Sequence, residues 1–285
     1  MSSETQPPEP FNRQARRIRR DRAAAAFGEH DFLRAAILDG IDERLAAVKR
    51  PMHDFLDMGS FDARFTPAGD ARVARVDAGF AFARAGGGVQ ADEDRLPFAD
   101  ASFDCVVSAG VLDQVNDVPG ALTLARRVLR PDGLFLGAFI GAGSLPVLRS
   151  VLLEAEAPRA VARIHPQIDV RSAGDLLVRA GLTLPVADIE TLSVRYSGLG
   201  RLIDDLRGMA ATNLLGDTPP LTRATLARAA EAFAARADAD GRVTERFQIV
   251  FLTGWAPDPS QPKPARRGSA TASLADALKN AQSQS

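Results

Sequence analysis

Cysteine is almost absent from this chain, since Cys105 is the only one among 285 residues. A single thiol cannot form a disulfide within the chain, which excludes a disulfide-stabilised secreted domain and fits a reducing compartment. The residue also lies inside an apolar run, FDCVVS. We therefore expect a cytoplasmic protein.

Long apolar runs are lacking as well. No stretch of 18 or more apolar residues occurs in the sequence, so no membrane-spanning helix is expected. The first residues carry no apolar segment of the kind found in secretory signal peptides, so secretion is not expected either. Peripheral contact with a membrane surface stays open.

Neither sign of charge dominates, and histidine is rare. The 35 basic and 36 acidic side chains give a formal net charge of −1, which creates no overall field for attracting nucleic acid. His30, His53 and His165 are widely spaced and show no facial-triad signature. We expect neither a nucleic-acid partner nor a metal site.

Residues 89–141 carry the clearest structural pattern. A short strand precedes the acidic cluster DED at 92–94, and apolar runs follow at 103–108 and 134–140. Between these runs, apolar residues recur at helical spacing over 118–129, behind the N-cap candidate Asp117 and before the turn PDG at 131–133. Alternating strands and helices predict a parallel sheet with helices on its faces.

The remaining elements fit the same α/β plan. A strand and its turn are predicted at 54–59. Further strands are predicted at 72–77, 186–196 and 247–255, the last of them antiparallel at the sheet edge. Helices are predicted at 32–48, 144–157, 172–180, 199–211 and 221–235, with Ser172 as a helix cap.

The predicted organisation is one α/β domain with flexible ends. Residues 1–28 form a flexible basic segment, 29–256 form the domain with helical insertions near 144–180 and 197–235, and 257–285 form a tail whose piece at 266–269 docks. Six arginines at 13–22 admit two interpretations. They lie on a solvated helix, or they close over an anionic ligand or a partner protein.

These motifs resemble the class I S-adenosylmethionine-dependent methyltransferases. The resemblance rests on DEDRLPF at 92–98, FDCVVS at 103–108 and LRPDG at 129–133. It implies a Rossmann-like fold with a mostly parallel seven-stranded sheet, helices on both faces and an antiparallel edge strand.

The resemblance also implies a cofactor site for S-adenosylmethionine. Its expected cofactor-binding residues lie at strand ends and turns: Asp57, Gly59, Asp77, Asp92, Glu93 and Ser108. Asp77 matches the family's ribose-binding acid and Asp92 its adenine-binding acid, whereas the side chains of Glu93 and Asp94 are expected to be solvated. The family's glycine-rich turn is reduced to Gly59, because Phe61 and Ala63 occupy the later glycine positions.

A closer resemblance covers nearly the whole chain. FNR at 11–13, YSG at 196–198, DLRGM at 205–209 and RGSAT at 267–271 resemble the methyltransferase-like assembly factors of respiratory complex I, a family associated with arginine hydroxylation. This implies a complex I subunit as partner.

Three functions therefore stay open: methyl transfer to an unknown acceptor, action on a complex I subunit, or partner binding without catalysis. No catalytic base is assigned. His165 and Tyr196 are candidates for residues near the active site.

Overall fold

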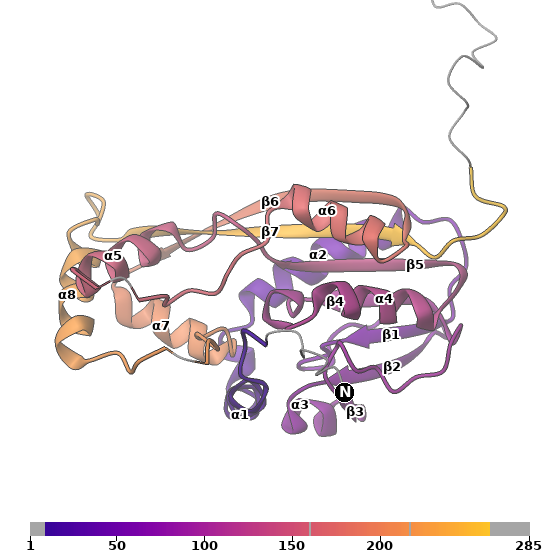
Figure 1. Cartoon of the computed structure of the whole chain (residues 1–285), viewed down its shortest axis with the longest axis horizontal. Helices are drawn as coiled ribbons and strands as arrows, with labels where there is room; N and C mark the ends of the chain where they lie inside the picture. Colours follow the sequence, from indigo (N-terminus) through magenta and orange to yellow (C-terminus); the bar gives the residue numbers. More distant parts are fainter. Residues whose placement is uncertain (1–8, 160, 217, 263–285) are drawn as a thin grey trace, which may run out of the picture.

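The computed structural model describes residues 9–159, 161–216 and 218–262 (Figure 1). The predicted docking piece at 266–269 and the motif at 267–271 lie outside these residues, so both stay predictions.

A seven-stranded sheet forms the centre of the molecule, with strand order β3-β2-β1-β4-β5-β7-β6. The first five strands in this order are parallel, and β7 runs antiparallel to both of its neighbours, β5 and β6. The strands are β1 (Asp54–Met58), β2 (Arg72–Asp77), β3 (Val89–Gln90), β4 (Phe103–Ala109), β5 (Leu129–Ile140), β6 (Thr183–Tyr196) and β7 (Val243–Trp255). This confirms the predicted fold class.

The prediction for the last strand was wrong in one respect. The strand β7 is antiparallel, as expected, but it lies between β5 and β6, and β6 forms the sheet edge. Burial explains this arrangement: β7 is largely buried and rich in apolar residues, whereas β6 exposes Val186 and Ile189.

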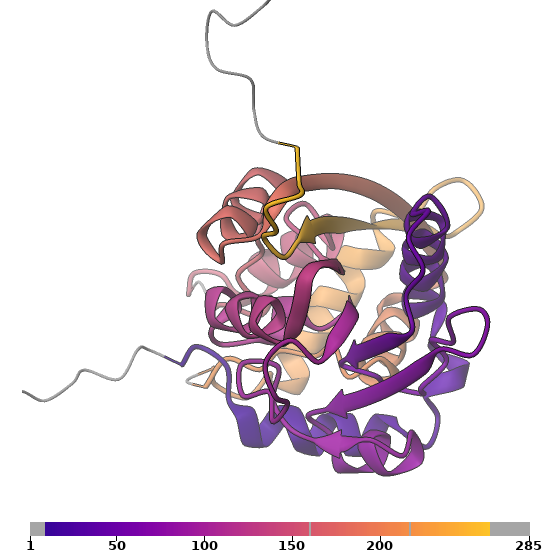
Figure 2. The ribbon, with the colours of Figure 1, turned by 90° about the vertical axis from the view of Figure 1, so that its right-hand side faces the viewer.

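Helices cover both faces of the sheet (Figure 2). On one face, α4 (Val118–Val128) and α6 (Val170–Arg179) pack with the strands in one apolar core. On the other face, α2 (Phe32–Ala46) contributes Ile37 and Ile41 to a second core. The strands β1, β4 and β5 between these helices are largely buried, as expected for strands covered on both faces.

Three helices extend beyond the sheet: α5 (Pro146–Glu156), α7 (Leu199–Gly208) and α8 (Arg223–Ala234) (Figure 1). They share a separate apolar core with the far ends of β6 and β7. The helix α6, predicted within the insertion, packs beside α4 instead, and its N-cap is Asp169 rather than Ser172.

The basic segment differs from the prediction of a flexible end. Residues Arg13–Ala23 form helix α1, capped by the Asn12 side chain, and α1 lies along the end of the sheet beside α3 (Phe80–Ala85) (Figure 2). Short 3-10 turns follow at Phe27–Glu29 and Leu112–Gln114. In the described part of the chain, no helix has both the length and the apolar character needed to span a bilayer.

Candidate functional site

The predicted site residues gather where the parallel strands end. Asp57 and Asp77 lie at the ends of β1 and β2, Asp92 follows β3, and Ser108 lies near the end of β4. The side chains of these residues are at most 2% exposed. Because ligands of open α/β sheets bind outside this carboxyl edge, the fold brings together the residues that the sequence singles out.

The turn after β1 has left-handed backbone angles at three positions, of which only Gly59 is a glycine. Gly59 has φ +83°, and Phe61 and Ala63 also have positive φ values of 46° and 57°. Residues with a Cβ adopt this left-handed region at a cost of about 1–2 kcal/mol each, so the surrounding structure must enforce it. The turn thus keeps a tight path while Phe61 adds an aromatic ring.

That ring belongs to a small aromatic cluster under α1. Phe61 stacks on Phe27 at 5.0 Å and meets the edge of Phe82 at 5.5 Å. The guanidinium of Arg20 lies over the same ring, 3.8 Å from its centroid. A cation over a buried aromatic face is favourable, so the cluster fixes Arg20 in place.

Arg20 is bound to the carboxylate of Asp77, and both side chains are fully buried. Arg20 Nε donates to Oδ1 at 2.8 Å, and Nη2 donates to Oδ2. The backbone N–H groups of Gly79 and Phe61 donate to the same two oxygens at 2.7 and 2.9 Å. Burial alone would raise the pKa of Asp77, but these donors hold it below its usual value.

Three more arginines of α1 also pair with carboxylates at this edge of the sheet. Arg16 forms two hydrogen bonds with Glu93, Arg17 donates to Asp92 at 2.7 Å, and Arg13 forms two hydrogen bonds with Asp94. Positions 13, 16, 17 and 20 share one helix face. The expectation that Glu93 and Asp94 are solvated was therefore wrong, because α1 covers both carboxylates.

A second buried arginine secures the turn from the other side. Arg34 of α2 donates to the backbone oxygens of Gly59, Ser60 and Ala109 at 2.6–3.0 Å. Sequence reasoning missed this residue. Its signal was its position on the apolar face of α2, three and seven residues before Ile37 and Ile41, where a charged side chain requires a buried partner.

Three predicted site residues have unsatisfied polar atoms. Within the described residues, both carboxylate oxygens of Asp57, Oδ1 of Asp92 and the hydroxyl of Ser108 are buried without a hydrogen-bond partner. Burial raises the pKa of Asp57, although Arg34 lies 3.6 Å away. Unpaired buried polar groups are costly, and they mark positions where a ligand atom can bind.

The candidates His165 and Tyr196 do not join this edge. His165 Nε2 accepts a hydrogen bond from the Leu214 N–H at 2.7 Å, and burial together with nearby Arg19 lowers its pKa to about 4. Tyr196 packs in the apolar core shared by α5, α7 and α8. Asp113, which follows β4, has a pKa raised to about 7 by burial.

In this conformation the edge does not fit an adenosyl cofactor. Both oxygens of Asp77 are hydrogen-bonded to Arg20, and the guanidinium fills the space between Asp77 and Phe61. A ribose bound at Asp77 and the side chain of Arg20 would exclude each other. Among the described residues, no group of three or more potential metal ligands occurs.

Comparison with known proteins supports this assignment of the fold. A family model described as a methyltransferase domain matches residues 56–137. The solved structure of the YcgJ protein from Bacillus subtilis superposes with a TM-score of 0.53 at 17% identity, covering 79% of this chain and 99% of that one.

Two sequence relatives are more specific. The zebrafish (Danio rerio) protein named arginine-hydroxylase NDUFAF5, mitochondrial, is 40% identical over 202 residues, which are 69% of this chain and 63% of that protein. A malonyl-[acyl-carrier protein] O-methyltransferase of Laribacter hongkongensis is 29% identical over 267 residues, covering 83% of this chain and 87% of that enzyme.

The fold is the Rossmann-like fold of class I S-adenosylmethionine-dependent methyltransferases, and residues 56–137 match a methyltransferase domain. In sequence the chain resembles the NDUFAF5 proteins, and the match covers less than two thirds of their length. Both resemblances seen in the sequence are confirmed, but the match to the zebrafish protein covers 69% of this chain and not nearly all of it.

Proposed function

We propose that the carboxyl edge of the sheet binds S-adenosylmethionine and that the protein transfers its methyl group to an acceptor that stays unassigned. One observation carries this proposal: Asp57, Asp77, Asp92 and Ser108 are collected at the strand ends around a turn with glycine-like backbone angles. The methyltransferase domain match covers the same region.

Binding would require α1 to move away from the edge. Asp77 would then accept hydrogen bonds from the ribose hydroxyls and Asp92 one from the adenine amino group. The cofactor would supply an electrophilic methyl group. The protein's own contribution would be to position the partners and exclude water, which for well-oriented reactants is worth roughly 7–11 kcal/mol.

Calorimetry tests this proposal. Titration of the full chain with S-adenosylhomocysteine should give saturable binding, and Asp77→Asn should abolish it. The control is Asp100→Asn, which changes an exposed aspartate away from the strand ends. If neither the wild-type chain nor the variant Arg20→Ala, which releases α1, bound S-adenosylhomocysteine, the proposal would be overturned. That result would favour a protein that binds a partner without catalysis.

A second candidate function is hydroxylation of an arginine in a protein subunit of respiratory complex I. The 40% identity to a protein named arginine-hydroxylase favours it, and so do the contacts of four guanidinium groups along the acidic edge. Hydroxylation is a two-electron oxidation of a C–H bond, so it would require an oxidant such as dioxygen together with an electron donor.

Mass spectrometry separates the two candidates. If the second is right, complex I subunits from a deletion strain should lack a 16-Da modification on arginine that complementation restores. Lost assembly with an unchanged modification pattern would contradict it. A cytoplasmic location stays a prediction based on the single cysteine, whereas the NDUFAF5 relatives are named mitochondrial.

A further inference from the structure

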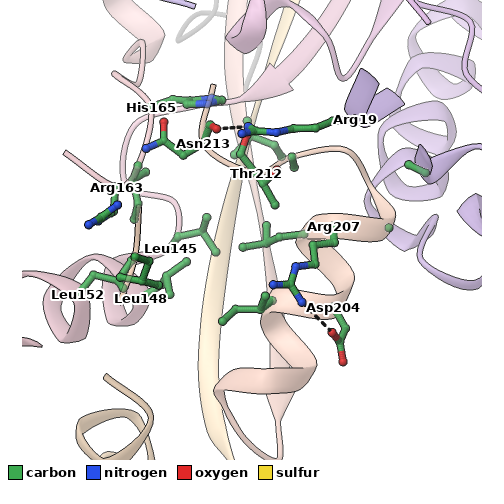
Figure 3. Close-up of a pocket in the computed structure, with 18 of the residues that line it drawn as sticks. Arg19, Leu145, Leu148, Leu152, Arg163, His165, Asp204, Arg207, Thr212 and Asn213 are labelled. Atoms are coloured by element: carbon green, nitrogen blue, oxygen red, sulfur yellow. Dashed lines mark hydrogen bonds and ion pairs between the residues drawn. The ribbon is translucent and has the colours of Figure 1, made fainter. Parts of the chain in front are cut away.

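A large cavity lies on the other side of α1 from the acidic edge. It has a volume of about 1020 Å³ and is bounded by α1, the loop around His165, α5 and α7 (Figure 3). This is at the upper end of the range in which proteins bind small organic ligands. None of the carboxylates paired with α1 lines it.

The inner wall of the cavity is apolar. Leu145, Leu148 and Leu152 line it from α5 and the residue before that helix, and Figure 3 shows them together on one side. Phe247 of β7 and Leu226 of α8 extend this wall. Such a surface binds a hydrocarbon or aromatic body.

The rim of the cavity carries an excess of positive charge. Five arginines line it, Arg19, Arg22, Arg163, Arg201 and Arg207, against the three acids Glu29, Asp113 and Asp204. Arg163 is paired with Glu156, and Arg207 lies 3.8 Å from Asp204. With the described residues, Arg22 and Arg201 form no ion pair.

Arg19 is a cation without a counter-ion in the described part of the chain. It donates to the backbone oxygens of Thr212 and Asn213, which are neutral acceptors (Figure 3). Burial and the nearby charge of Arg22 lower its pKa, so this position disfavours the charge that the side chain carries. An anion between Arg19 and Arg22 would relieve that cost.

His165 adds a neutral donor to the same rim. Its Nε2 accepts from Leu214, so in the neutral ring the proton lies on Nδ1. Because the ring of His165 is neutral, it adds no positive charge to the rim.

We propose that this cavity is a binding site for a small molecule with an apolar body and one anionic head group, a carboxylate or a phosphate. The body packs against the leucines of α5, and the head group is held by Arg19, Arg22 and Arg201. The proposal does not rest on cofactor binding, because the cavity is open in the conformation that excludes the cofactor from Asp77.

Fluorescent probes of matched shape test this proposal on the full chain. The anionic probe 1-anilinonaphthalene-8-sulfonate should bind saturably with one site per chain, and the neutral N-phenyl-1-naphthylamine should bind more weakly. Dodecanoate and dodecyl phosphate should displace the anionic probe better than dodecanol, and their ranking identifies the head group.

Arginine variants give the decisive comparison. The double variant Arg22→Gln/Arg201→Gln should weaken binding of the anionic probe at least about tenfold and leave the neutral probe unchanged, because two guanidinium groups that hold the anionic head group are lost. The control is Arg171→Gln on α6, an exposed arginine outside the cavity. Equal binding of both probes, an unaffected double variant, or no saturable binding would each overturn the proposal.

Discussion

Arg20 of α1 and Asp77 of β2 form a fully buried ion pair at the place where the fold's ligands bind. The pair joins residues 57 positions apart and is completed by the backbone N–H groups of Phe61 and Gly79. The helix α1 therefore occupies the carboxyl edge of the sheet with its own cation. Because a buried pair gains little over its desolvation cost, a ligand that satisfies Asp77 can compete with Arg20.

Truncation of Arg20 should destabilise the ligand-free protein. Arg20→Ala leaves the buried Asp77 charge without its cation, which should lower the free energy of unfolding by about 3 kcal/mol. Urea denaturation followed by circular dichroism measures this change. Arg22→Ala, on the exposed face of the same helix, should cost less than about 0.5 kcal/mol. An equal loss in both variants would show that Arg20 owes its effect to the helix rather than to Asp77.

Ligand binding should release α1. If S-adenosylhomocysteine replaces Arg20 at Asp77, the backbone amides of α1 should exchange with deuterium faster in the complex, because the helix loses its tertiary contacts. Hydrogen exchange with mass spectrometry measures this directly. Peptides from α4, which packs in the sheet core, serve as the internal reference. Slower exchange of α1 in the complex would contradict the competition.

Gly59 should tolerate no side chain. Its φ is +83°, and an added Cβ would clash with the methyl carbons of Val111. Gly59→Ala should therefore cost about 3 kcal/mol of stability, combining left-handed strain with overpacking. Gly69→Ala is the matched control, because it has a φ of +76° and nothing within 4 Å. If both variants lose the same stability, the contact with Val111 contributes nothing.

Asp113 should make stability depend on pH. Its pKa is raised to about 7, so between the ordinary value of 3.8 and about 7 the folded state binds more protons than the unfolded state. By linkage the free energy of unfolding contributed by this group falls as pH rises through that window. Asp113→Asn should therefore gain stability relative to wild type between pH 4 and 7, by up to about 2 kcal/mol after discounting for partial solvent access.

The test compares the pH dependence of the free energy of unfolding for the wild type and Asp113→Asn. Taking the difference between the two cancels the contributions of the other titrating groups. His165 contributes the opposite slope, because its pKa is lowered to about 4 and its stabilisation is lost as pH falls from 6.5. Both proteins contain His165, so its effect cancels. Parallel stability profiles for the wild type and Asp113→Asn would contradict the raised pKa.

Local patterns in the sequence predicted most of the fold. The strand at 72–77 matches β2 residue for residue, and the helix at 118–129 ends one residue from α4, because apolar periodicity and capping residues act locally. The place of β7 inside the sheet was missed. Strand order depends on contacts among residues far apart in the chain, which periodicity does not encode.

The site was predicted in part for the same reason. The acids at strand ends follow from the parallel topology, which brings Asp57, Asp77 and Asp92 to one edge. The arginines that contact this edge could not be predicted from the sequence. The arginines of α1 and Arg34 reach the site through the tertiary fold, and a basic helix face has the same sequence pattern whether it meets water or a row of carboxylates.

The dissociation constant of S-adenosylhomocysteine, measured by calorimetry for wild type, Arg20→Ala and Arg20→Ala/Asp77→Asn, tests the central claim most directly. Removing the competing guanidinium raises the fraction of chains with an open edge, so Arg20→Ala should bind about tenfold more tightly than wild type. The double variant should not bind. Equal or weaker binding by Arg20→Ala, or binding that survives the loss of the Asp77 carboxylate, would contradict the account.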